Sequence, residues 1–496
     1  MRSPDLFRRR GWPAAAVALA FAAVAGAEEP VRTMSLSDAV RAAVANSRAI
    51  RDARLGRASD TLDLRLARDQ FRPDLIVASG LSLNQTWTNP RNADDTMAAG
   101  EWADVQAAVR LAIPTGGEVQ FVWDAASTRD TERGGTVAGA EHGRGWQVAL
   151  VQPLLRGGGV AVGTADLAAA HLSDRQSALA YSQSLMSVIT QAILAFRDLA
   201  RAVRELEIVR GSLADARRLA EVNGALIDAG RMAPVDLVQT ETEVANKEVD
   251  VLVAENTVEA ARLALVDVLD LPVGTVIEPS YAPSAAVTPP DQAAVEALAL
   301  ERRPDLLAAE LDVELANLEL TVAANDRLPD LGLAASYGGA VSHPLALDDS
   351  LRDRGWSTGL TLGYTFGDVA RSVRYGQAKI GVERAELALR ELEDRVRLEV
   401  ANRVREVNVL QRGVDLARRA RELSERQLEV EGEKLRVGRS SNFEYLRLQS
   451  DLVASRAREL AAAVAYLNSL TLLDETVGTT LDTWGITVES LEREAP

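Results

Sequence analysis

A strand-rich segment followed by a very long helical segment occurs twice in this chain of 496 residues. In the first half, short alternating segments fill residues 73–157, and a helical pattern follows over 157–230. The same order returns in the second half, over 329–367 and then 367–438. The helical spans cover 73 and 71 residues, and at about 1.5 Å of rise per residue each makes a helix of roughly 100 Å. A compact globular core needs no such length, so the duplication predicts an elongated body.

Six segments alternate apolar and polar residues with a period of two, which predicts strands with one apolar and one polar face. The first unit holds four of them and the second holds two: Leu75–Trp87, Val105–Ile113, Val119–Trp123, Trp146–Leu154, Leu331–Tyr337 and Trp356–Phe366. An ordinary half-buried sheet and a membrane barrel with a lipid-facing apolar side both fit this alternation.

Tryptophan positions favour the barrel. Five of the seven tryptophans lie in or beside the predicted strands, near polar loops: Trp87, Trp102, Trp123, Trp146 and Trp356. Aromatic side chains gather in this way at membrane interfaces. We therefore predict that these five form an aromatic girdle. One protomer cannot close six strands into a barrel around such long helices, so an oligomer is expected.

The first 27 residues resemble a secretory signal. Arg8–Arg10 are basic, Ala14–Ala25 is apolar, and Ala25–Ala27 offers a small-x-small cleavage site. A retained membrane anchor is the alternative. No later run of 18 apolar residues is apparent, so we expect no membrane-spanning helix after the signal.

Composition excludes several functions. A net charge of −17 offers nucleic acid no basic face, and the absence of cysteine excludes disulfides and thiolate metal sites. The three histidines, His142, His171 and His343, lie far apart in the sequence, with the first and last in predicted outer loops. The many Glu and Arg residues of the long helices are expected to be solvated. We predict no enzyme, no catalytic residues, no cofactor and no metal site.

The chain resembles TolC-type outer-membrane efflux proteins. The resemblance rests on a Pro-Asp-Leu start to the strand region of each half, on Gln152–Leu155 followed by Gly157-Gly158, and on Val437-Gly438 before a new helix. It implies a homotrimer in the outer membrane, with a multi-pass β-barrel in the lipid and an α-helical tunnel in the periplasm. It also implies two partners, a periplasmic adaptor (membrane fusion protein) and an inner-membrane pump.

The same resemblance assigns roles at the periplasmic tip. The turns at Gly230 and Gly438 correspond to adaptor-docking turns. The charged residues that follow correspond to the periplasmic gate: Asp236, Arg439, Glu444 and Arg447. Many relatives carry an acid where Arg447 stands and an arginine where Ser440 stands, so this gate departs from the common pattern. Ser441 and Glu444 also fit a helix capping box, and a purely capping role is the alternative.

These patterns give the following organisation. Residues 1–27 are the signal peptide and 477–496 a C-terminal tail. The first repeat, 28–285, contains strands at about 74–154, a long helix at about 160–228 and a helix at about 235–270. The second repeat, 286–476, contains strands at about 330–366, a long helix at about 368–436 and a helix at about 442–473. The fold class is an α+β membrane protein, internally duplicated, with long antiparallel coiled-coil helices forming a tunnel and β-hairpins forming a trimeric barrel.

The first strand region is the longer one. Residues 73–157 span 84 positions and residues 329–367 span 38, while the long helices match within two residues. The surplus predicts two additional strands joined at Pro114–Gly117, hence six strands per protomer and eighteen per trimer. The lumen would then be lined by Gln106, Arg110, Gln120 and Asp124. Alternatively, the extra hairpin folds over the mouth or packs beside the barrel.

The predicted function is an outer-membrane exit duct of a tripartite efflux or type I secretion system, a trimeric passive channel. A periplasmic coiled-coil adaptor or scaffold protein is the main alternative, and a passive porin is a second one.

Overall fold

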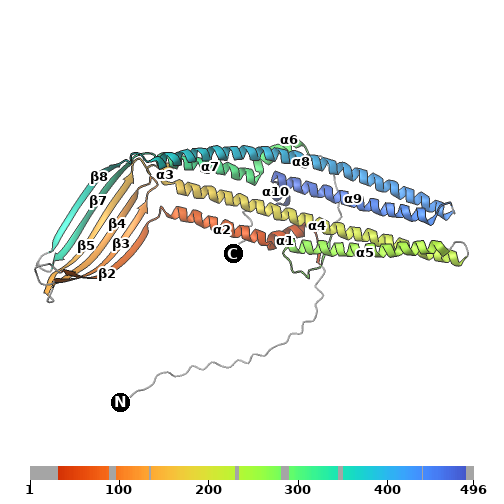
Figure 1. The fold of residues 1–496 in the computed structure, drawn as a ribbon, viewed down its shortest axis with the longest axis horizontal. Coiled ribbons are helices and arrows are strands. Elements are labelled where there is room, and N and C mark those ends of the chain that lie inside the picture. Colours follow the sequence, from red (N-terminus) through yellow and green to blue (C-terminus); the bar gives the residue numbers. More distant parts are fainter. Residues whose placement is uncertain are drawn as a thin grey trace, which may run out of the picture.

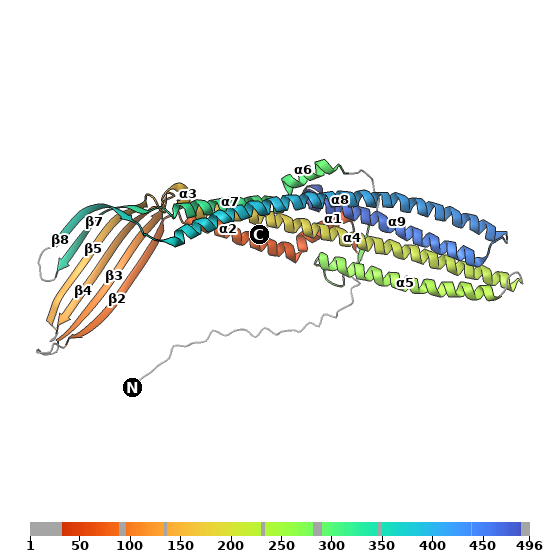
Figure 2. The same cartoon turned by 45° about the horizontal axis from the view of Figure 1, so that its top comes forward.

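The computed structural model describes residues 32–88, 96–132, 136–229, 234–280, 290–344, 350–437 and 439–487. The molecule is elongated, with a sheet at one end and long helices extending from it (Figure 1). The same arrangement, turned by 45°, shows the curvature of the strands (Figure 2). The predicted combination of long helices and antiparallel strands is confirmed. The predicted signal peptide lies outside the described residues.

The duplication is visible in the helix lengths. Helices α1 (Leu36–Asn46) and α6 (Gln292–Arg302) have 11 residues each, and α2 (Arg48–Asp69) and α7 (Pro304–Asn325) have 22 each. The long helices α4 (Ala165–Asp228) and α8 (Val369–Arg436) have 64 and 68 residues. Each is followed by a returning helix, α5 (Pro234–Val268) of 35 residues and α9 (Asn442–Val477) of 36. Short helices α3 (Val160–Gly163) and α10 (Thr480–Trp484) complete the described set.

The six long strands form one antiparallel sheet in the order β2-β3-β4-β5-β7-β8. Their bounds are Asp74–Thr88, Thr96–Ala112, Glu118–Glu132, Thr136–Pro153, Asp330–Pro344 and Leu351–Gly363. Four strands come from the first half and two from the second, so the predicted count of six per protomer is confirmed. Strand β3 pairs with β2 and β4, and β4 pairs with β3 and β5, so the additional hairpin is part of the sheet and the alternative that it folds over the end of the sheet or packs beside it is wrong.

A second, two-stranded sheet was not predicted. Strand β1 (Arg32–Met34) pairs in parallel with β6 (Ile277–Pro279). Each has only three residues, too few for alternation to be read from the sequence. This pair joins the start of the first repeat to the segment that follows α5.

The sheet is fastened to the helices at one compact junction. Gln152, near the end of β5, accepts a hydrogen bond from the Thr115 hydroxyl at 2.7 Å and donates one to the Thr115 carbonyl at 2.9 Å. The Gly157 N–H donates to Asn325 Oδ1 at 2.7 Å, and Asn325 Nδ2 donates to the Leu155 carbonyl at 3.1 Å. The motif from Gln152 onward therefore joins the β3–β4 turn, the end of β5 and the end of α7.

Two apolar clusters hold the helical body together. One packs α1, α4 and the end of α5 against β1 and β6, with Leu185, Phe196 and Leu265 at its centre. The other packs α6, α7, α8 and α9. It contains four members of the apolar series on α8 that predicts helix pairing: Val396, Val400, Val404 and Val407. Leu387, from the same series, is 54% exposed.

A partly buried carboxyl group in α9, that of Asp474, makes stability depend on pH. Burial raises the pKa of Asp474 above its usual 3.8, although its hydrogen bond from Thr479 and the charge of Arg197 on α4 act in the opposite direction. The folded protein therefore binds this proton more tightly than the unfolded chain, and the contribution of this group to stability falls as pH rises from 3.8 through the raised folded pKa.

We predict that Asp474→Asn raises the melting temperature at pH 7, because the amide carries no charge to desolvate. The gain should vanish below about pH 3.8, where Asp474 is protonated in both states. Thermal unfolding across pH tests this, with Asp451→Asn as the control, because Asp451 is an exposed aspartate of the same helix. An equal shift for both variants, or a gain independent of pH, would contradict the prediction.

Candidate functional site

Strand register sorts the sheet into two chemically different faces. One face, here called the apolar face, carries most of the large apolar side chains of the sheet, together with some polar ones such as Glu101 and Arg129. The large apolar residues include Leu75, Val77, Leu81, Leu83, Val105, Val109, Phe121, Val148, Leu150, Leu333, Leu360 and Leu362. Many of them are well exposed, Leu81 at 76% and Leu362 at 70%. An exposed apolar surface of this extent marks contact with lipid or with another protein.

The opposite face, here called the polar face, carries the residues predicted for the lumen. Gln106 lies directly opposite Asp124, and Arg110 lies directly opposite Gln120. Arg110 also approaches Glu118, at 4.0 Å. Small or polar residues continue this face over the remaining strands, including Gln147, Ser336, Ser357 and Thr361. The four predicted lumen residues are thus brought together on one face.

Four of the five predicted girdle tryptophans share the apolar face. Trp123 and Trp146 are cross-strand partners, and the Trp146 ring packs edge-on against Tyr337 with centroids 5.3 Å apart. Trp356 lies opposite Tyr337, and Trp87 lies near the far end of β2. Trp102 lies opposite Ser82 on the polar face, because it stands an odd number of positions from Val105. The sequence predicted that Trp102 lies in or beside a strand, but it did not predict on which face of the sheet.

The predicted gate residues lie at the free end of the helices. Glu444 and Arg447, both on α9, approach each other at 3.7 Å, with 38% and 59% of their side chains exposed. The Arg439 N–H donates to the Lys434 carbonyl at 2.8 Å, which closes the end of α8. Asp236 is in the first turn of α5, but its side chain lies outside the described residues. Gly230 and Gly438 also lie outside them.

Ser441 caps the N-terminus of α9. The Glu444 N–H donates to the Ser441 hydroxyl at 3.3 Å, so Ser441 is the N-cap of α9. Phe443 and Arg447 of α9 also line a shallow groove with Val238 and Glu243 of α5. The first turns of α5 and α9 therefore lie side by side at the tip.

A further acid at the tip escaped sequence reasoning. Glu431, in the last turns of α8, accepts hydrogen bonds from the Ser440 hydroxyl at 2.5 Å and from Lys434 at 2.8 Å. Its pKa is lowered by Lys434 first and by Ser440 next. Ser440 is the position where many relatives carry arginine, and here it bonds this acid across the turn.

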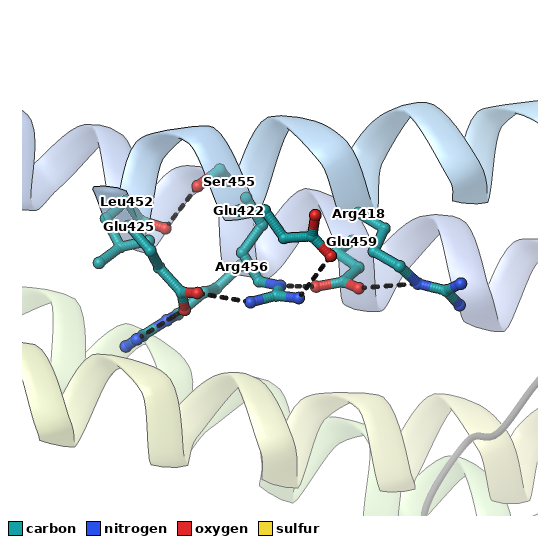
Figure 3. A network of polar contacts seen from close by, with 8 residues as sticks. Arg418, Glu422, Glu425, Leu452, Ser455, Arg456 and Glu459 are labelled. Carbon is teal, nitrogen blue, oxygen red and sulfur yellow. Dashed lines mark hydrogen bonds and ion pairs between the residues drawn. The ribbon is translucent and has the colours of Figure 1, made fainter. Parts of the chain in front are cut away.

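Charged residues also fix α9 against α8 above the tip (Figure 3). Arg421 of α8 contacts Glu459 of α9 at 2.5 Å and Glu425 of its own helix at 2.6 Å. Arg456 of α9 contacts the same Glu425 at 3.1 Å. These contacts alternate between the helices, so they disfavour a shift of one helix along the other and hold the tip in register.

Two histidines are closer than the sequence suggested. His142 on β5 and His343 on β7 are direct cross-strand partners, in strands and not in outer loops. His171, on α4, has its Nε2 atom 3.4 Å from a guanidinium nitrogen of Arg68 on α2. Across the described residues, no group of three or more His, Cys, Asp or Glu side chains is arranged to hold a metal ion.

The expectation of no helix suited to a membrane span needs a correction. Within the described residues, α4 contains an 18-residue window with mean hydropathy 1.3, enough by length and composition to cross a membrane. Half of that window is buried inside the protein, as in the core helix of a soluble protein. Apolar residues of α4 such as Leu185 and Phe196 belong to the first apolar cluster.

Part of the second repeat matches a known protein family. Residues 296–479 match the family model described as outer membrane efflux protein. The resemblance to TolC-type efflux proteins is confirmed. Proteins of the matched family are located in the outer membrane, which agrees with the location predicted for this chain. None of the curated proteins compared with the chain matches it.

Solved structures share the fold over most of the chain. The Campylobacter jejuni CmeC outer membrane channel is 15% identical with a TM-score of 0.64, covering 90% of this chain and 86% of that one. The outer membrane protein VceC from Vibrio cholerae is 15% identical with a TM-score of 0.64, covering 89% and 96%. A Pseudomonas aeruginosa membrane protein is 17% identical with a TM-score of 0.65, covering 89% and 93%. At these identities the likeness establishes the fold.

Proposed function

We propose that this protein is the outer-membrane exit duct of a tripartite efflux or type I secretion system, a passive channel formed by three copies. The observation that carries the proposal is the six-stranded sheet, which has one apolar and one polar face and whose edge strands β2 and β8 each pair on one side only within the described residues. It stands at the end of helices roughly 100 Å long. A soluble adaptor or scaffold has no use for such a sheet. No catalytic role is assigned to any residue.

Open edges support a ring of copies. Strands β2 and β8 are the outer members of the sheet order, so each leaves one side of its backbone unpaired. Unpaired backbone groups are too costly to leave in lipid. Pairing β8 of one protomer with β2 of the next closes eighteen strands into a barrel, with the apolar face outward and Gln106, Arg110, Gln120 and Asp124 inward.

Exposed stripes on the helices support the same ring. On α8, Val409, Leu416, Leu423 and Val430 recur every seven residues and are 54–65% exposed. On α5, Val238, Val249 and Leu252 are 59–65% exposed. Apolar residues at heptad spacing on a free helix face pair with another helix. These two helices belong to different repeats, so packing between neighbouring copies would close the tunnel.

Particle mass tests the proposal directly. Protein extracted from outer-membrane fractions should require detergent, and its mass should correspond to three chains after the detergent contribution is subtracted. A stable monomer would contradict the duct. Release from the periplasm without detergent would favour the adaptor or scaffold.

For the gate, we propose that Asp236 and Glu444, with Arg439 and Arg447, form the charged constriction at the periplasmic tip. An exposed pair contributes at most about 1 kcal/mol, so residues from three copies must act together. Asp236→Ala combined with Glu444→Ala should change single-channel conductance and cation preference in planar bilayers. Asp451→Ala, on the same helix α9, is the control. Unchanged conductance would leave these residues with the capping role only.

For docking, we propose that the turns containing Gly230 and Gly438 contact the periplasmic adaptor, which in turn engages the inner-membrane pump. Gly438→Trp should abolish transport in cells, measured as substrate accumulation, while the trimer remains in the outer membrane. Gly376→Trp is the control, because a Cβ at this position in α8 meets no atom within 4 Å in the described structure. Normal transport by the Gly438 variant would place docking elsewhere.

A further inference from the structure

We propose that the apolar face of the sheet carries a binding site for the phosphate group of a membrane glycolipid, formed by Arg144, Arg352 and Arg354 together with Trp146. These residues are here called the arginine rim. The proposal rests on the proposed function, because it places this face against lipid. It adds a specific lipid contact to a face that otherwise needs only to be apolar.

Register places the arginine rim at one border of the apolar face. One row across β4, β5, β7 and β8 consists of Phe121, Val148, Tyr337 and Trp356. The next row away from the helices is Trp123, Trp146, Gly339 and Arg354. The row after that is Ala125, Arg144, Val341 and Arg352. Aromatic side chains thus give way to arginines over these three rows.

The border lies where a membrane surface is expected. Leu362 starts the apolar side of β8 near the helices, and Arg352 is ten residues farther along the strand. At about 3.3 Å per residue this is about 33 Å along the strand. With a strand tilt of roughly 40°, it is about 25 Å along the membrane normal, the usual height of the apolar band of a membrane barrel.

The missing side chain at Gly339 lets Trp146 and Arg354 close over its backbone, which makes the rim a site and not only a set of charges. The position that a Cβ would take at Gly339 lies 3.3 Å from Trp146 Nε1 and 3.3 Å from Arg354 Cγ. Trp146 and Arg354 therefore lean over Gly339 from its two neighbouring strands. The groove beside it is lined by Trp123, Trp146, Arg144, Arg352, Arg354 and Asp353, together with small and apolar residues of β5 and β7. An indole N–H and guanidinium groups are all hydrogen-bond donors, the set that a phosphate accepts from.

The charge of the rim is not neutralised within the described residues. No ion pair is recorded for Arg144, Arg352 or Arg354, whereas Arg129 on the same face approaches Glu101 at 4.0 Å. Asp353, between two of the rim arginines, also lines this groove, and its carbonyl oxygen lies 3.2 Å from the Cβ position of Gly339. Alternation places its side chain on the polar face. Three guanidinium groups beside a wall of aromatic rings favour an anion that carries an apolar body.

Lipid chemistry fits this combination better than a free anion does. Tyr337 and Trp356 continue from the rim toward the apolar rows, so acyl chains attached to a bound phosphate would lie along Val148 and Leu360. The rim is on the part of the sheet remote from the helices, hence in the leaflet remote from the periplasm. The occupant to which we commit is a phosphorylated, multiply acylated glycolipid of that outer leaflet.

The test measures binding of bisphosphorylated lipid A to the detergent-extracted trimer by native mass spectrometry. Arg144→Gln, Arg352→Gln and Arg354→Gln should each weaken binding about tenfold, the usual result of losing one charge-assisted hydrogen bond. Arg110→Gln is the matched control, because it removes the same charge from the polar face. Wild-type protein should bind dephosphorylated lipid A at least tenfold more weakly, a comparison that needs no variant.

Three results would overturn the proposal: equal binding by the rim variants and the control, equal binding of phosphorylated and dephosphorylated lipid, or displacement of lipid A by millimolar inorganic phosphate alone. The last would identify a free-anion site. All three results would be observed on an intact trimer, so they would refute the lipid-binding site without contradicting the proposed duct. Failure to obtain a membrane-extracted trimer at all would instead refute the proposed function.

Discussion

Replacing Gly163 by alanine is expected to destabilise the protein by about 2–3 kcal/mol, because it overpacks the junction between sheet and helices. A Cβ at this position, in α3, would lie 2.4 Å from the Pro114 carbonyl oxygen and 2.5 Å from the Gly116 nitrogen. Both are backbone atoms of the β3–β4 turn, so neither can rotate away. Thermal unfolding and the yield of membrane-inserted trimer measure the effect.

Gly211→Ala is the matched control for this change. Gly211 lies within α4, and a Cβ there meets no atom within 4 Å in the described structure. Alanine is the better helix former by about 1 kcal/mol, so this variant should be equally or more stable than the wild type. If Gly163→Ala and Gly211→Ala have the same thermal stability and the same yield of trimer, the β3–β4 turn is not packed against α3 as closely as the structure indicates.

The sheet was readable from the sequence because alternation in a strand has a simple period. Trp123 and Trp146, or Arg110 and Gln120, fall on shared faces once each strand is recognised. The surplus of residues before Gly157 also predicted the two additional strands correctly. These features depend on local patterns, and local patterns survive without knowledge of which strands pair.

Register and long-range contacts were not readable in the same way. The adjacency of His142 and His343 depends on the pairing of β5 with β7, which are separated in the chain by helices α3, α4 and α5, strand β6, and helices α6 and α7. Gly339 has no distinguishing neighbours in the sequence, and only the strand pairing shows that Trp146 and Arg354 lie over it. The gate and docking residues remain predictions, because Gly230, Gly438 and the Asp236 side chain lie outside the described residues.

Arg197 illustrates the same difference within the helices. The sequence suggested a solvated arginine on a long helix, but only 8% of Arg197 is exposed. From α4 it donates to the Leu467 carbonyl at 2.6 Å and to the Thr471 hydroxyl at 2.8 Å, both on α9. It therefore joins the two repeats through hydrogen bonds that no helical periodicity could reveal.

Arg197→Ala is expected to lower the free energy of unfolding by about 3 kcal/mol, since it removes buried bonds from a charged donor and leaves their acceptors without it. Arg204→Ala is the control on the same helix: its partner Glu207 is 2.6 Å away, but both side chains are about half exposed. That exposed pair is expected to contribute less than about 1 kcal/mol. Arg197→Lys should restore only part of the loss, because one ammonium group cannot replace a planar guanidinium. Equal losses for the alanine variants would contradict the assigned role.

The effect of Arg197 on stability should also depend on pH, because its charge acts on Asp474. The charge of Arg197 opposes the burial that raises the pKa of Asp474. Removing the arginine should raise that pKa further, so the variant should lose more stability at pH 7 than below pH 3.8, where the carboxyl is protonated in both states. Asp474→Asn should consequently stabilise the Arg197→Ala background more than it stabilises the wild type. A double-mutant cycle at pH 7 measures this difference, and a coupling energy of zero would show that the two groups do not interact across the junction of the repeats.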